Sequence, residues 1–487
     1  MNINLETFRD RVHACWVGKN IGGTMGAPYE GCRKTLDIKG FATEANVIIP
    51  NDDLDLQLVW LYAVEQLGPF GLTAQKLGEF WLNFVSPYWN EYGLGKLNLR
   101  RGLVPPMTGD FNNDWRNSNG AWIRTEIWAT LAPGNPGVAA RYAIEDAMVD
   151  HGTGEGTHAA AFVAAMQSSA FVSNDIRQMI DTGLRFIPAD SRMAQSIRLL
   201  LKCWDDGMDA MEAREKIYEQ NKDIGDGWFE APSNVSYAVL GLLWGGGDFK
   251  KSMITAINCG DDTDCTGATV GATLGMMHGM AGIPEDWRAH IGDAIETVCV
   301  TKSIVTRSAF PKTCTELTEK VLKAAPVMLF ANHCDLTVSS DPDDFDGYEK
   351  VFDKQAKKIL SRFAAFKRYT TEHDLLRCRA TVIFGEPPVI KGGETKKIVL
   401  RLENKVGELG RLPHSITLNA YSADGLELVD PPKSLMLPHT PQYYDYTSET
   451  ELVVKAPEKT RSVNRMVLEL IFEGHPTVEY IPVVFYS

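Results

Sequence analysis

The hydrophobic pattern of this 487-residue chain changes its period once, at about residue 370. Before that point apolar residues recur at three- and four-residue steps, which is typical of one buried helical face, as in Leu54, Leu58, Leu61 and Val64. After it, apolar and polar residues alternate with a period of two, as in Cys378, Ala380, Val382 and Phe384. The sequence therefore predicts a helical region followed by a strand-rich region.

This change sets the predicted domain boundaries. A chain of this length exceeds what one hydrophobic core normally holds. We predict an all-α domain over 1–335, a linker and connecting helix over 336–369, and a small all-β sandwich over 370–487. Strands do not alternate with helices in the first region, so a Rossmann domain is not expected.

The predicted helices cover about 51–67, 73–86, 138–149, 156–172, 189–205, 208–221, 248–257, 264–280, 285–298 and 344–366. The predicted strands include 398–402, 415–421, 451–456, 466–472 and 478–486.

The charge balance bears on the class of partner. The sequence has 49 Lys and Arg against 63 Asp and Glu, a net charge of −14. Such a surface repels phosphate backbones and anionic lipid, so we expect neither nucleic acid nor membrane as a partner.

The nine cysteines show no CxxC pair, which argues against a zinc ribbon or a disulfide scaffold. The N-terminal stretch lacks a signal pattern, so a cytoplasmic location is predicted.

Two short acidic segments stand out, each opening a predicted helix. The first is Asn51-Asp52-Asp53, and the second runs from Gly260 to Cys265 and includes Asp262 and Asp264. Acids in a first helical turn often do no more than cap the helix, and Asn51 is a suitable N-cap. Adjacent carboxylates are nevertheless costly unless a cation neutralises them. Carboxylates without His partners suit Mg²⁺ or Mn²⁺ rather than zinc. Two such ions could hold a sugar diol and acidify a bound water.

Glycines repeat along the helix after the second acidic segment. Gly267, Gly271 and Gly275 are four residues apart. Because glycine weakens a helix, its repetition on one face indicates close backbone packing against a neighbouring helix. We expect that neighbour to be the helix beginning at Asp53.

Four segments resemble, in order, the signature segments of ADP-ribosylglycohydrolases, a family that includes the dinitrogenase reductase-activating glycohydrolases. They are GKNIGGTMGAPYEG (18–31), PNDDLDLQLVW (50–60), SNGAWIR (118–124) and NCGDDTDCTGATVGATLG (258–275). The segment GMAGIPEDW (279–287) resembles the family's ending. The resemblance covers about 1–300 and implies an all-α fold with two Mg²⁺ or Mn²⁺ ions. It also implies hydrolysis of the bond between C1 of ADP-ribose and a side-chain nitrogen or oxygen.

The resemblance also implies a set of site residues. The expected metal ligands are Asn51, Asp52, Asp53, Asp262, Asp264 and Cys265. Glu30 and Asp53 are expected to be catalytic, with Glu30 positioning or deprotonating water. The phosphate- or ribose-binding residues are expected to be Ser118, Asn119 and Gly120. The family has a His-containing, Gly-rich stretch near its ligand, which corresponds here to Asp150 and His151. A lone histidine, however, is more often a structural residue.

Three positions depart from the family pattern. Asn51 and Cys265 stand where the family usually has Thr, and Asp261 stands where it usually has Gly. Asn51 still offers a carbonyl oxygen, whereas a thiol is a poor ligand for Mg²⁺. The metal coordination position that the Cys265 thiol does not fill is taken either by water or substrate, or by the Asp261 carboxylate.

Two classes of function follow. The first is a hydrolase acting on an ADP-ribosylated protein or on a small ADP-ribosyl or other furanosyl substrate, through water activated at a binuclear Mg²⁺ or Mn²⁺ site. The second is a non-catalytic ADP-ribose-binding or crystallin-like structural protein on the same fold. Loss of the acidic residues would favour the second class, and both acidic segments are intact.

Overall fold

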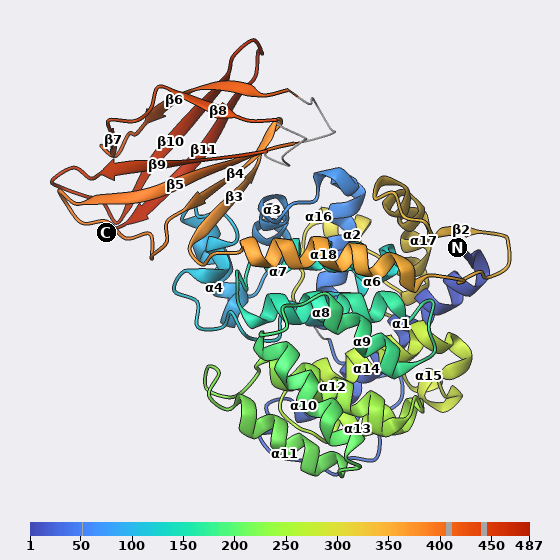
Figure 1. Ribbon diagram of the computed structural model, residues 1–487. Coiled ribbons are helices and arrows are strands. Elements are labelled where there is room, and N and C mark those ends of the chain that lie inside the picture. Colours follow the sequence, from blue (N-terminus) through green and yellow to red (C-terminus); the bar gives the residue numbers. More distant parts are fainter. Residues whose placement is uncertain (51, 406–411, 440–445) are drawn as a thin grey trace. The chain divides into compact units, whose positions relative to one another are not determined.

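The computed structural model describes residues 1–50, 52–405, 412–439 and 446–487. It divides into two compact units, and neither unit is a single stretch of sequence. The first comprises 1–92, 114–147 and 154–366, and the second comprises 93–113, 148–153 and 367–487. The fold is thus a helical domain followed by a strand-rich region made of antiparallel sheets, as the change of period predicted (Figure 1).

The first unit is built almost entirely of helices. A short parallel pair, β1 (Asn2–Asn4) with β2 (Thr337–Ser339), joins its two ends. Its α-helices are α1 (Leu5–Gly26), α2 (Asp52–Leu67), α3 (Ala74–Phe84), α6 (Glu126–Leu131), α7 (Pro136–Ala147), α8 (Glu155–Ser169), α9 (Ile176–Arg185), α10 (Arg192–Asp205), α11 (Ala210–Asn221), α12 (Ala231–Gly245), α13 (Phe249–Ile257), α14 (Thr263–His278), α15 (Glu285–Ile291), α16 (Ile304–Ala309), α17 (Cys314–Ala331) and α18 (Glu349–Ala365). Helix α4 (Asn90–Arg100) begins in the first unit and ends in the second.

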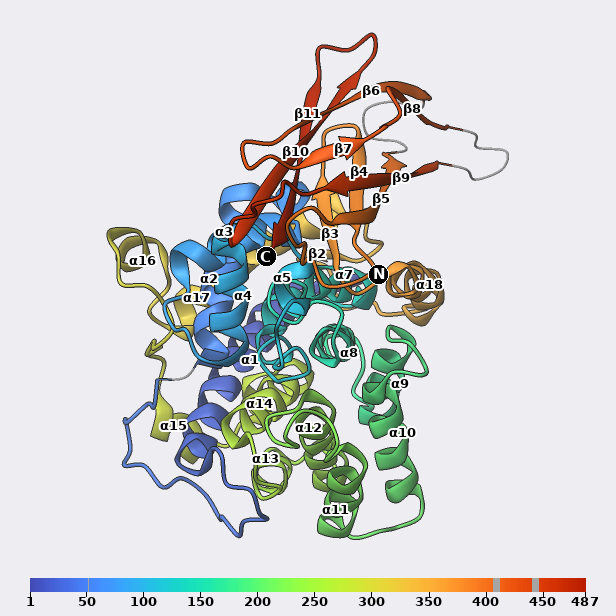
Figure 2. The same ribbon diagram turned by 90° about the vertical axis from the view of Figure 1, so that its left-hand side faces the viewer.

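Helices α1 and α14 lie side by side in very close contact within the first unit (Figures 1 and 2). Glycines line both sides of the contact. A Cβ atom added to Gly22 would lie 2.1 Å from the carbonyl oxygen of Gly267, and one added to Gly18 would lie 2.2 Å from that of Gly271. No side chain larger than hydrogen fits between backbones at this separation. The predicted close packing of α14 is confirmed, but the predicted partner is wrong. The partner is α1 and not α2, because α1 supplies the matching glycines.

The second unit has two antiparallel sheets around one core. The first sheet has the order β11-β10-β6-β8 and the second has the order β3-β4-β5-β9-β7. The strands are β3 (Thr370–Asp374), β4 (Cys378–Ile383), β5 (Thr395–Asn404), β6 (His414–Tyr421), β7 (Glu427–Val429), β8 (Ser434–Leu437), β9 (Thr447–Lys455), β10 (Val463–Phe472) and β11 (Val478–Tyr486). Their inward side chains share the core with Leu103, Met107 and Phe111, of which Met107 lies in the short helix α5 (Met107–Asp110).

Some predicted bounds differ from the structure. Helix α15 ends at Ile291 and not near 298, because Gly292 adopts a φ of +74° that breaks the helix. The connecting helix begins at Glu349, five residues after the predicted start at 344. Among the described residues, no helix has the length and apolar character needed to cross a membrane.

Candidate metal centre

The acidic segments meet at a cavity of about 430 Å³ in the first unit. Asp52 reaches it from the first turn of α2, and Asp262, Asp264 and Cys265 reach it from the start of α14. Glu30 lies on the cavity lining, directly after the 3₁₀ turn that follows α1. Two segments more than 200 residues apart in sequence therefore place their acids together, as the sequence predicted.

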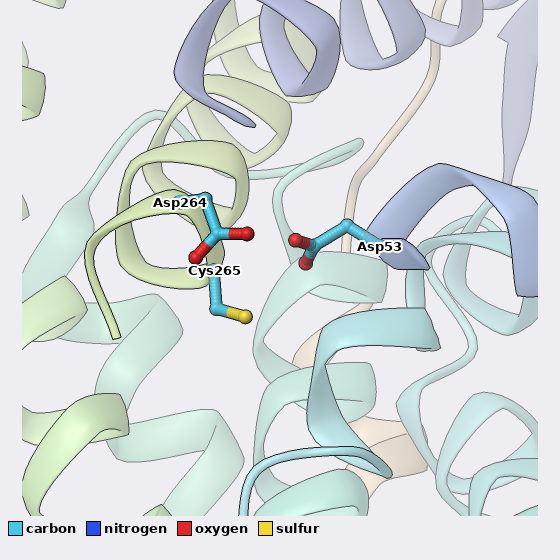
Figure 3. Close-up of side chains that lie close together, drawn as sticks. All are labelled: Asp53, Asp264 and Cys265. Atoms are coloured by element: carbon cyan, nitrogen blue, oxygen red, sulfur yellow. The ribbon is translucent and has the colours of Figure 1, made fainter. Parts of the chain in front are cut away.

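The potential ligand atoms form two overlapping groups. Asp53, Asp264 and Cys265 each offer an atom within 4.8 Å of the others, and Glu30, Asp262 and Asp264 do the same. In Figure 3 the carboxylates of Asp53 and Asp264 point toward each other from α2 and α14. Among the described residues, Asp264 is the only member common to both groups.

Burial makes these carboxylates costly in their charged form. It raises the pKa of Asp53 to about 7, although Lys19 opposes the shift. Burial also raises the pKa values of Asp262 and Asp264 well above the usual range. The buried Oδ1 atom of Asp264 has no hydrogen-bond partner in the described part of the chain. A concentration of buried acids with an unsatisfied oxygen fits a hard divalent cation.

Neutral side chains fix two of these acids in place. The Tyr92 hydroxyl donates to Asp52 Oδ2 at 2.8 Å, and the Asn119 side-chain amide donates to Asp262 Oδ2 at 2.6 Å. Asn119 is itself held, because its Oδ1 accepts from the Trp122 indole N–H at 2.9 Å. Metal ligands are commonly oriented by hydrogen bonds of this kind.

Asp55 has a different role from its neighbours in the first acidic segment. Its Oδ2 accepts the backbone N–H groups of Val298, at 2.6 Å, and of Cys299. These bonds hold the chain segment that brings Val298 to the cavity lining. Asp55 is therefore a structural acid, whereas Asp52 and Asp53 lie at the candidate centre.

The family model for ADP-ribosylglycohydrolases matches residues 4–318, which is more than half of the chain. The chain belongs to the ADP-ribosylglycohydrolase family. This is a hydrolase family, and the matched residues include every one described above as lining the cavity.

Structural comparison gives weaker likenesses. A solved structure titled "ADP-ribosylglycohydrolase-related protein complex" aligns over 66% of this chain and 100% of its own, with 18% identity and a TM-score of 0.46. A FixG-related protein from Vibrio parahaemolyticus aligns over 19% of this chain and 78% of its own, with 8% identity and a TM-score of 0.16. A comparison with curated proteins gave no match.

The remaining predicted site residues of this family member lie as follows. Ser118, Asn119 and Gly120 line the cavity. Asp150 and His151 are buried in the second unit, where Asp150 Oδ1 lies 3.0 Å from His151 Nδ1, and their contact with a ligand stays a prediction. Asn51 lies outside the described residues.

Asp261, which replaces the family's usual glycine, is not in either group of potential metal ligands. Its φ is +66°, a conformation that explains why glycine is usual there. Its carboxylate accepts the backbone N–H of Phe229 at 3.1 Å and the side-chain amide of Asn234 at 2.8 Å. Phe229 also has a positive φ, +56°, and lines the cavity. The carboxylate therefore stabilises a strained turn.

This geometry predicts an ordered series of stabilities at position 261. Asp261→Ala should lower the free energy of unfolding by about 2–4 kcal/mol, because it adds backbone strain and leaves the Phe229 N–H unpaired. Asp261→Gly relieves the strain and should cost less than the Ala variant. Asp261→Asn keeps an acceptor oxygen and should cost least. Urea unfolding measures the series, and an Ala variant as stable as the Asn variant would contradict this role.

Proposed function

We propose that this family member is a metal-dependent hydrolase that removes ADP-ribose from an N- or O-linked acceptor. The observation that supports this most strongly is the buried, unpartnered oxygen of Asp264, shared by two groups of potential ligands. We propose Asp52, Asp53, Asp262 and Asp264 as ligands for two Mg²⁺ or Mn²⁺ ions. Such ions would hold the ribose hydroxyls and acidify a water for attack at C1.

Residues of the protein would orient the water, accept its proton and contact the substrate. Glu30 is solvent-exposed and lines the cavity, where its carboxylate can orient a water and accept its proton. Partial burial of its carboxyl group and the nearby charge of Asp52 raise the pKa of Glu30, which strengthens it as a base. Ser118, Asn119 and Gly120 form part of the cavity wall and are proposed to contact the ribose or phosphates. A Cβ atom at Gly120 would lie 2.2 Å from Glu91 Oε1, so a larger residue there would require the Glu91 side chain to move.

Titration of ADP-ribose into the metal-stripped protein, before and after Mg²⁺ is restored, tests the proposal. We expect calorimetry to detect binding of ADP-ribose only after Mg²⁺ has been added, with two ions bound per chain. Equal binding of ADP-ribose with and without metal would contradict the role of the ions. Failure of ADP-ribose to bind in either state would contradict the proposed substrate class.

Cys265 provides a separate prediction about the metal. Its thiol is buried, and burial raises its pKa well above the usual range. A neutral thiol is a weak partner for a hard cation, whereas a hydroxyl is a better one. Cys265→Thr should tighten Mg²⁺ at one site by about tenfold, equivalent to about 1.4 kcal/mol, and leave the other site unchanged. Asp261→Gly serves as the comparison and should retain both ions, because Asp261 faces Phe229 and Asn234. Loss of an ion from the Asp261→Gly variant would instead assign the ligand role to Asp261.

A further inference from the structure

Lys19 is a buried cation beside the candidate metal centre. It lies on α1, with only 1% of its side chain exposed. Its ammonium is 3.3 Å from Asp53 Oδ1, 3.1 Å from Glu126 Oε2 and 2.7 Å from the carbonyl oxygen of Ile123. An ammonium has three N–H donors, so these three acceptors match its whole hydrogen-bonding capacity.

Glu126 is the second acid that contacts Lys19. Its carboxylate is fully buried and accepts from Gln57 Nε2 at 2.6 Å and from Gln167 Nε2 at 2.8 Å. Gln57 is held in turn, because its Oε1 accepts the backbone N–H of Ile127 at 2.8 Å. The Glu126 carboxylate that contacts the ammonium is therefore held by side chains of α2 and α8.

We propose that Lys19 is a positioning residue of the metal centre, which rests on the function proposed above. The ammonium lies 3.3 Å from Oδ1 of Asp53 and so restrains this carboxylate beside the candidate centre. The contact also fixes the rotation of the carboxylate, whose ligand atom lies within 4.8 Å of those of Asp264 and Cys265. Without the ammonium contact the Asp53 carboxylate could rotate, and the rotation would alter the geometry of the site.

A purely structural role makes a different prediction. If Lys19 served only to neutralise Glu126, removing both charges would restore the centre. The set of variants is therefore Lys19→Met, Glu126→Gln and the double variant Lys19→Met/Glu126→Gln, with Lys39→Met as a control at an exposed lysine. The readout is the affinity for Mn²⁺ alone, measured by calorimetry on the full-length protein.

The positioning role predicts that Lys19→Met weakens Mn²⁺ binding by about 10- to 100-fold, as expected for a residue that orients a metal ligand. Glu126→Gln should bind Mn²⁺ nearly as the wild type does, and the double variant should be as weak as Lys19→Met. Wild-type affinity in the double variant would overturn the inference. If Lys19→Met fails to fold, the comparison of Glu126→Gln with the double variant decides the question. Failure of the wild type to bind Mn²⁺ would instead overturn the proposed function itself.

Discussion

We expect the Asp264→Asn variant to bind neither divalent ion and to lose hydrolase activity. Asp264 belongs to both groups of potential ligands, whereas Asp53 and Asp262 each belong to one. An amide at position 264 offers one neutral oxygen in place of a carboxylate that belongs to both groups of potential ligands. Turnover should fall by at least about 100-fold, because even residues that only orient metal ligands contribute 10- to 100-fold.

Unfolding experiments distinguish a loss of metal binding in Asp264→Asn from misfolding of the variant. Added Mg²⁺ at 100 times its Kd should stabilise the wild type by about 2.7 kcal/mol and should not stabilise Asp264→Asn. The metal-free variant should be at least as stable as the metal-free wild type, because it removes a buried charge crowded by Asp262 and Asp53. Asp286→Asn, at an exposed acid paired with Lys250, is the control and should respond to Mg²⁺ as the wild type does. A folded Asp264→Asn variant that still bound two ions would refute the proposed role of Asp264 as a ligand.

The second large effect is expected from Gly22→Ala, which should lower the free energy of unfolding by about 3 kcal/mol or more. The added methyl group would lie 2.1 Å from the oxygen and 2.2 Å from the carbon of the Gly267 carbonyl group. Both atoms belong to the backbone of α14, so no rotamer change relieves the overlap. The helices must separate, and α14 carries the proposed metal ligands Asp264 and Cys265 in its first turn.

Gly40→Ala is the matched control, because a Cβ atom there would meet no other atom within 4 Å. Urea unfolding of the two variants at equal m-values gives the comparison. Metal affinity should fall with stability in Gly22→Ala and should not change in Gly40→Ala. A Gly22→Ala variant within about 1 kcal/mol of the wild type would show that α1 and α14 are packed less closely than the structure indicates.

The two acidic segments could be singled out from the sequence because each lies at the start of a helix whose apolar residues recur at three- and four-residue steps. The sequence did not predict α1 as a helix, although the structure forms one over Leu5–Gly26. Gly18, Gly22, Gly23 and Gly26 lower the intrinsic helix propensity of this segment. Packing against α14 compensates for that loss, and packing between segments some 250 residues apart is invisible to local patterns.

The sequence analysis also missed Lys19, Tyr92 and Glu126. Lys19 lies inside a recognised motif, but nothing local indicates that its ammonium is buried between two acids. Similarly, Leu103, Met107 and Phe111 lie far from the strands in sequence yet share their core. A boundary drawn where the hydrophobic period changes cannot assign such residues, because their contacts are not local.

The most direct test of the account is the release of ADP-ribose from ADP-ribosyl-arginine and from an O-linked ADP-ribosyl substrate, measured as Mg²⁺ or Mn²⁺ is restored to metal-stripped protein. The account predicts no release in excess chelator and a rate that rises as the two ions bind. Release at the full rate in excess chelator, or no release from either substrate at any metal concentration, would contradict it.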